Sequence, residues 1–71
     1  MTPEQQQAAE KLQAAIRSRF SSISPTIIDS GMGPAVKLGV SPDKLSEIEA
    51  AMQDLTMEIM LDTGVLVMLM A

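Results

Sequence analysis

The segment from Ser41 to Ala71 most constrains the fold, because it opens with a helix-entry signal and its second half is apolar on nearly every side. Ser41 can cap a helix, Pro42 suits the first helical position, and Asp43 opposes the positive helix end. Apolar residues then recur at three- and four-residue steps, as on one side of a helix. They are Leu45, Ile48, Met52, Leu55, Ile59, Leu66 and Leu69. We therefore expect a helix over about residues 42–69.

Two other structures compete for the end of this segment. Val65 and Val67 are β-branched and follow Gly64, so a C-terminal strand is the alternative to a continuous helix. The surrounding Leu and Met residues favour the helix, which we prefer. A membrane span needs about 20 apolar residues, whereas the uncharged run covers only residues 63–71, so we exclude it.

Acidic residues line a second side of the same segment. They are Asp43, Glu47, Asp54, Glu58 and Asp62, and no basic residue follows Lys44. The simplest interpretation is a solvated face, because carboxylates are usually exposed. The alternative is a docking edge for basic groups of a partner, for which Asp54, Glu58 and Asp62 are the candidate residues. We expect Asp62 to lie at a rim, hydrated or paired, because burying a lone carboxylate is costly.

The N-terminus carries a second helix-entry signal. Thr2, Pro3 and Gln5 have the spacing of a capping box, which predicts a helix over about residues 3–22. Arg17 and Arg19 lie late in this helix, where they either suit its negative end or form a small anion-binding cluster. If the acidic edge docks on basic residues of helix 1 or of a second subunit, these arginines should lie near Asp54, Glu58 or Asp62.

The connector between the two helices is punctuated by glycine and proline. Ser24-Pro25 can open a helix, and Gly31, Gly33 and Pro34 interrupt it. We expect one or two short helices between residues 25 and 38. The Gly-Met-Gly-Pro sequence lacks the Lys-Ser/Thr ending of a phosphate-binding loop, so it is a weak ligand motif.

These elements predict an all-α fold. Residues 1–71 would form a single domain, an antiparallel helical hairpin with short helices in its connector. Helix 1 offers mainly alanines against the apolar C-terminal segment, so we expect a second copy of the chain to cover it. The predicted interface of this homo-oligomer comprises Leu55, Ile59, Val65, Leu66, Leu69 and Met70.

The composition excludes most chemistries. The chain has no cysteine and no histidine, which removes disulfides, thiolate metal sites and the commonest general base. We expect no enzyme activity, no cofactor and no metal. A net charge of −4 and a single aromatic residue argue against nucleic-acid binding. Because the N-terminus resembles neither a signal peptide nor a lipidation motif, we expect a cytoplasmic location.

By elimination, the sequence favours a small non-enzymatic protein-interaction module. It would be homo-oligomeric and would act as an inhibitor, adaptor or chaperone of the kind found in bacteria or phages. Seven methionines would suit an adaptable contact surface, although methionine is also ordinary core filler. Two alternatives stay open: a structural subunit of a filament, ring or virion, and an oligomer that holds a small anionic ligand through Arg17 and Arg19.

Overall fold

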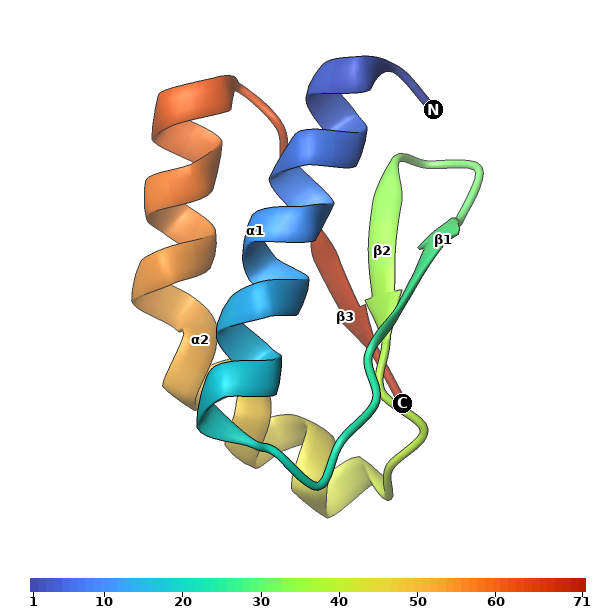
Figure 1. Ribbon diagram of the computed structural model, residues 1–71, viewed down its shortest axis with the longest axis vertical. Coiled ribbons are helices and arrows are strands. Elements are labelled where there is room, and N and C mark those ends of the chain that lie inside the picture. Colours follow the sequence, from blue (N-terminus) through green and yellow to red (C-terminus); the bar gives the residue numbers. More distant parts are fainter.

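The computed structural model describes residues 1–71 and shows two helices packed on one face of a three-stranded sheet (Figure 1). The expectation of an all-α fold is therefore wrong, and the fold is α+β. In chain order the elements are α1 (Pro3–Arg19), β1 (Thr26–Asp29), β2 (Pro34–Lys37), α2 (Pro42–Thr63) and β3 (Met68–Met70). The molecule measures 28 × 22 × 17 Å.

Helix α1 begins as predicted and ends slightly earlier. The Thr2 hydroxyl accepts a hydrogen bond from the Gln5 backbone N–H at 3.2 Å, and the Gln5 side chain accepts one from the Thr2 N–H at 3.0 Å. This reciprocal pair is the expected capping box. The helix ends at Arg19 because Phe20 leaves the helical region, with φ −126° and ψ 72°.

The connector forms a β-hairpin, so the prediction of short helices between residues 25 and 38 is wrong. Strands β1 and β2 pair antiparallel, with Ile27 opposite Val36 and Ile28 opposite Ala35. β-Branched residues favour strands when cross-strand neighbours can cover them. Pro25 and Pro34 are residues that could each begin a helix, but the pairing of β1 with β2 determines the structure of this segment.

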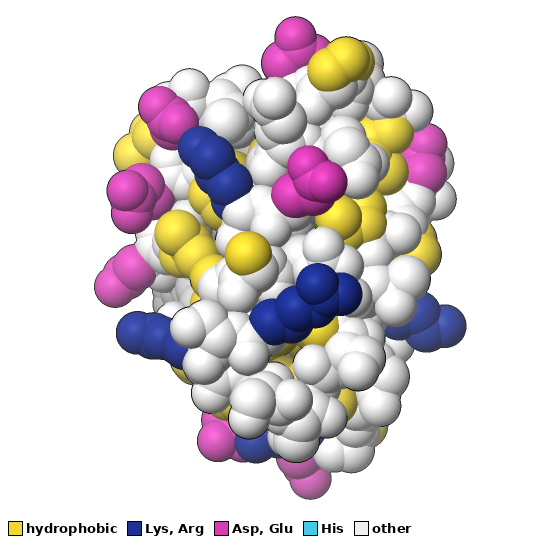
Figure 2. All heavy atoms as spheres, in the orientation of Figure 1, with side chains coloured by type: hydrophobic (Ala, Val, Ile, Leu, Met, Phe, Trp, Pro, Cys, Tyr) yellow, Lys and Arg dark blue, Asp and Glu magenta, His cyan; other side chains and the backbone are white.

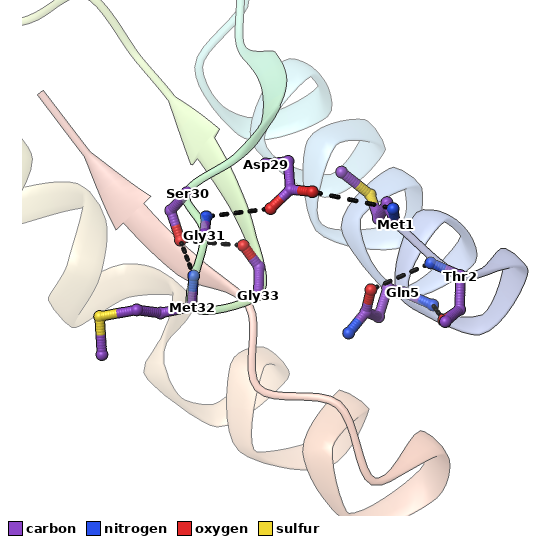
Figure 3. A network of polar contacts seen from close by, with 8 residues as sticks. All are labelled: Met1, Thr2, Gln5, Asp29, Ser30, Gly31, Met32 and Gly33. Carbon is purple, nitrogen blue, oxygen red and sulfur yellow. Dashed lines mark hydrogen bonds and ion pairs between the residues drawn. The ribbon is translucent and has the colours of Figure 1, made fainter.

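The hairpin turn is held by local polar contacts (Figure 3). Asp29 accepts the Gly31 N–H at 3.0 Å, and the Ser30 hydroxyl donates to the Gly33 carbonyl at 2.9 Å. Gly31 and Gly33 have φ of 83° and 127°, values that side chains strongly disfavour. The N-terminal amine of Met1 lies 3.7 Å from Asp29 and anchors the start of the chain beside the turn. The positive φ values explain why glycine occupies both positions, and the polar contacts hold the turn in place.

Helix α2 starts as predicted and stops at Thr63, six residues before the expected end. The Ser41 hydroxyl accepts the Lys44 N–H at 3.4 Å. Gly64 adopts the left-handed conformation with φ 74° and donates its N–H to the Met60 carbonyl at 2.8 Å, which closes the helix. The Thr63 hydroxyl accepts the Val65 N–H at 3.2 Å and directs the chain away from the helix axis. The alternative of a C-terminal strand after Gly64 is confirmed.

Strand β3 lies parallel to β2 and places β2 in the centre of the sheet. Residues Ile27, Val36 and Leu69 occupy one cross-strand row and pack on the core under the helices. The next row is Ile28, Ala35 and Met68. It lies on the opposite face, because successive residues of a strand point to opposite sides.

The core lies between the sheet and both helices. Helix α1 packs on β1 and β2, and α2 packs on α1 and β3. The largest fully buried side chains of the core include Leu12, Ile16, Val36, Ile48 and Met52. Val67 is 2% exposed, so the chain's own sheet and helices cover a residue of the apolar C-terminal run. Neither helix is long and apolar enough to cross a membrane.

Candidate functional site

An open groove of about 610 Å³ runs between helix α2 and the segment that contains strand β3. Ten residues line it, and seven of them are hydrophobic. The lining residues from α2 are Glu49, Ala50, Gln53, Thr56, Met57 and Met60, and those from the C-terminal segment are Leu66, Val67, Met68 and Leu69.

The helical wall of the groove is the flank of α2 that lies beside its buried face. The buried face contains Ile48, Met52 and Ile59. Gln53 and Met60 follow these positions by one residue, which corresponds to a rotation of about 100° around the helix axis. A second helix would be needed to cover this flank, but α1 lies on the other side of α2. The flank therefore remains open.

The strand wall of the groove is the free edge of β3. The sheet order β1-β2-β3 leaves this edge without a neighbouring strand. The Met70 carbonyl faces β2, because it accepts the Leu38 N–H at 2.8 Å. Backbone groups of successive strand residues point to opposite edges, so those of Val67 and Leu69 point away from β2 and into the groove. An exposed edge of this kind can pair with another strand.

Charge is distributed unevenly around α2. The groove contains one charged residue, Glu49, whereas the acidic residues Asp54, Glu58 and Asp62 lie on the opposite flank, beside α1. Figure 2 shows acidic side chains gathered over α2 on the helical face of the molecule. Lys11 of α1 reaches Asp62 at 3.5 Å. The acidic line and the groove are thus two separate surfaces of one helix.

The structure separates the six predicted interface residues into three groups. Ile59 is 3% exposed and belongs to the core, so little of it is available for contact with a second copy. Leu55, Val65 and Leu69 are half-buried and pack against the core. Leu66 and Met70 are 57% and 40% exposed, which leaves them free for contact. Of the six, only Leu66 and Leu69 line the groove.

The acidic and the basic residues that were predicted to pair do not contact each other within the chain. Asp54, Glu58 and Asp62 are all exposed, and the rim position predicted for Asp62 is confirmed by its pairing with Lys11. Arg17 and Arg19 form no ion pair with these acids within the chain, and a contact between subunits stays a prediction. Arg19 instead donates to the Ala51 backbone carbonyl at 3.1 Å and links the C-terminal end of α1 to α2.

Sequence reasoning missed four contributors to the exposed apolar surface. Met57 and Met60 line the groove, Met68 lies on the strand beside it, and Ile28 lies on the uncovered face of the sheet. A signal for the helical pair was present: Gln53, Thr56, Met57 and Met60 form an uncharged strip within an otherwise acidic helix. The sheet positions could not be found without knowing the strand pairing.

The described residues contain no cluster of carboxylates that could hold a metal ion. Comparison of the chain with family models, with curated proteins and with solved structures gave no match. The geometry of the groove is therefore the basis for any functional inference.

Proposed function

We propose that the chain is a small non-enzymatic protein-interaction module that self-associates, and that the groove between α2 and β3 is its contact surface. The observation that carries this proposal is the coincidence of an apolar helix flank with a free strand edge. Each feature alone is common on protein surfaces. Together they offer side-chain and backbone contacts to the same partner.

The composition of the groove supports protein contact. Interfaces are depleted of charge at their centres and enriched in methionine relative to the remaining surface. The groove has one charged residue and contains Met57, Met60 and Met68. Methionine side chains adapt their shape to an apolar partner, since they are unbranched and have several rotatable bonds. The same surface would suit an inhibitor, adaptor or chaperone.

The chemistry of the chain favours binding over catalysis. A general acid or base usually requires histidine or a carboxyl group with a perturbed pKa in a cleft. The chain has no histidine, and Glu49 is the only carboxylate that lines the groove. Backbone groups and apolar side chains, which dominate this site, recognise other polypeptides.

The alternative of a structural subunit differs from a closed oligomer in its growth. A two-fold symmetric contact uses the groove of both copies and stops at a fixed mass, whereas a head-to-tail contact leaves a free surface and continues. The proposal of an anion-binding oligomer has less support, because Arg19 already donates to the Ala51 backbone carbonyl.

A matched pair of substitutions tests the proposal. Leu66→Glu places a charge in the groove, and Leu61→Glu places the same charge at a residue that is 79% exposed and lies outside it. We expect wild-type protein and Leu61→Glu to show the same increase in mass with concentration by light scattering. Leu66→Glu should remain monomeric, because burying an unpaired carboxylate at an interface is costly.

Circular dichroism of both variants provides the folding control. We expect wild-type spectra for both, since each side chain is exposed in the monomer. Equal association of Leu66→Glu and wild-type protein would show that the groove is not the contact surface. A wild-type protein that grows without limit would favour the structural-subunit alternative.

A further inference from the structure

We infer that a second groove, between helices α1 and α2, binds a cationic amphipathic helix of another protein. This helical groove has a volume of about 610 Å³ and shares only Met57 with the groove between α2 and β3. It is a separate surface, so the inference does not depend on the self-association proposed for the first groove. Three observations lead to it: the rows of side chains on α2, the unbalanced charge, and the lack of a matching helix in this chain.

Two neighbouring rows of α2 side chains face the helical groove. One row is acidic and contains Asp54, Glu58 and Asp62. The other is apolar and contains Met57 and Leu61, which are 48% and 79% exposed. Residues four apart form a ridge along a helix, and a partner helix packs a ridge of its own side chains between two such ridges. Figure 2 shows acidic and hydrophobic side chains next to each other along the left side of the molecule, over α2.

The two rows favour a helix over an extended segment as the partner. A strand directs every second side chain to one face, so it presents a single row to the surface that it covers. A helix presents two adjacent rows, because residues at three- and four-residue steps share one side. Asp54 and Asp62 are about 12 Å apart along the axis of α2, and basic residues at four-residue steps of a helix lying along α2 have the same spacing. One helix can therefore place a basic row on the acids and an apolar row on Met57 and Leu61.

The charge of the helical groove favours a cationic partner. Its three carboxylates are accompanied by one ammonium group, that of Lys11, which leaves a net charge of −2. The Lys11 Nζ atom is 3.5 Å from an Asp62 carboxylate oxygen, whereas Asp54 and Glu58 form no ion pair. The groove thus holds half of the chain's net charge of −4. Nucleic acid or an acidic membrane surface would be repelled here, because both are anionic.

A second copy of the chain does not match this surface. Its helix α1 has the basic residues Lys11, Arg17 and Arg19 but exposes no large hydrophobic side chain. Its helix α2 exposes Met57 and Leu61 beside acidic residues, so two such helices would repel each other. The occupant is therefore a helix of another protein. Self-association through one groove and capture of a helix in the other would give the chain the two contacts of an adaptor.

Binding of a synthetic peptide tests the inference. The probe is a fluorescein-labelled peptide of about 18 residues, long enough to form several helical turns, with arginine at four-residue steps, leucine in the neighbouring row and alanine elsewhere. The control peptide has the same composition in an order that forms neither row. A general attraction between opposite charges acts on both peptides. We expect the probe to bind at least about tenfold more tightly by fluorescence anisotropy, because only the probe meets the acidic and the apolar row together.

Matched variants of the chain locate the contact. Leu61→Ala should weaken binding of the probe at least about tenfold, because it removes most of an exposed apolar side chain. Glu58→Gln should weaken it about three- to fivefold, the effect of one exposed ion pair. Glu10→Gln is the control for the change in net charge, because Glu10 is exposed and lines neither groove. In about 1 M salt the effect of Glu58→Gln should disappear, while that of Leu61→Ala should persist.

Light scattering of the same proteins keeps this inference distinct from the proposed function. Leu61→Ala should self-associate like the wild type, and Leu66→Glu should bind the probe no more weakly than the wild type while staying monomeric. Binding of the probe by a wild-type chain that stays monomeric would support the helical groove and contradict only the proposed function.

Two results would overturn the inference. Equal binding of the probe and the control peptide, or equal losses from Glu58→Gln and Glu10→Gln, would show a general attraction of charges without a defined site. Absence of binding by the probe, and by a second peptide with arginine at alternating three- and four-residue steps, would show that the helical groove accepts no cationic helix. Tight binding of the probe that is lost in Leu61→Ala and kept in Glu10→Gln is the expected result.

Discussion

At the scale of single residues, Gly64 determines where α2 ends and where the C-terminal strand can begin. Its φ of 74° is unfavourable for a residue with a side chain, and an added Cβ would meet no atom within 4 Å. Replacement by alanine therefore introduces backbone strain without a clash. We expect Gly64→Ala to lower the free energy of unfolding by about 1–2 kcal/mol in a urea titration. Gly64→Asn should lower it less, because asparagine tolerates this conformation better. Equal stability of the alanine variant and the wild type would contradict the left-handed cap.

Two methionines of α2 show how position decides the role of one residue type. Met52 is 1% exposed in the core, whereas Met57 is 48% exposed beside the groove. We expect Met52→Ala to destabilise the monomer by about 2–5 kcal/mol, because it leaves a cavity. Met57→Ala should change stability by less than about 0.5 kcal/mol and should weaken self-association instead. Chemical denaturation and sedimentation of the same two variants provide both measurements, and similar effects from both would contradict their assigned positions.

At the scale of elements, the two helix starts were predictable from the sequence, and the sheet was not. The caps at Thr2 and Ser41 depend on residues within one helical turn, so local chemistry determines them. The strands have only three or four residues, and each depends on a partner distant in sequence. Ile27 and Leu69 suit the apolar side of either a helix or a strand, and only the observed pairing decides between the two structures. Gly64 and the β-branched Val65 and Val67 were the local signals for a strand at this end of the chain.

Only part of the candidate site was predictable, because it too depends on which segments pack together. Leu66 and Leu69 were expected at an interface, and both line the groove. Ile59 was also expected there because it continues the apolar stripe, but that stripe faces the core. A helical pattern identifies an apolar face without showing which neighbour covers it. The short strand β3, folded back beside α2, supplies part of the cover that we assigned to a second copy.

Amide exchange can examine the free edge of β3 residue by residue. The Leu38 N–H donates within the chain, and the Met70 backbone faces β2, so both amides should exchange slowly at every protein concentration. The amides of Val67 and Leu69 face the groove and should exchange quickly in dilute solution. We expect them to become protected as the concentration rises and a second copy covers the groove. Unchanged exchange at Val67 and Leu69 in an associated sample would contradict the groove as the contact surface.

At the scale of the whole molecule, the presence of a core within one chain separates folding from association. Ten buried residues from the two helices and the segment between them form a single cluster with Val67 of the C-terminal segment. We therefore expect the monomer of Leu66→Glu to unfold cooperatively, with a urea midpoint close to that of the wild type at low concentration. A midpoint that depends on concentration should occur only in variants that associate. Complete unfolding of Leu66→Glu in the absence of urea would show that folding requires the second copy.

The most direct test of the central claim is a nuclear Overhauser experiment on a mixture of isotope-labelled and unlabelled chains, filtered for contacts between copies. We expect such contacts between the Met57 and Met60 methyl groups of one copy and the Leu66 and Leu69 side chains of the other. Contacts restricted to Leu61 or to Ile28, or no contacts in a concentrated sample, would contradict the assignment of the groove between α2 and β3 as the interaction surface.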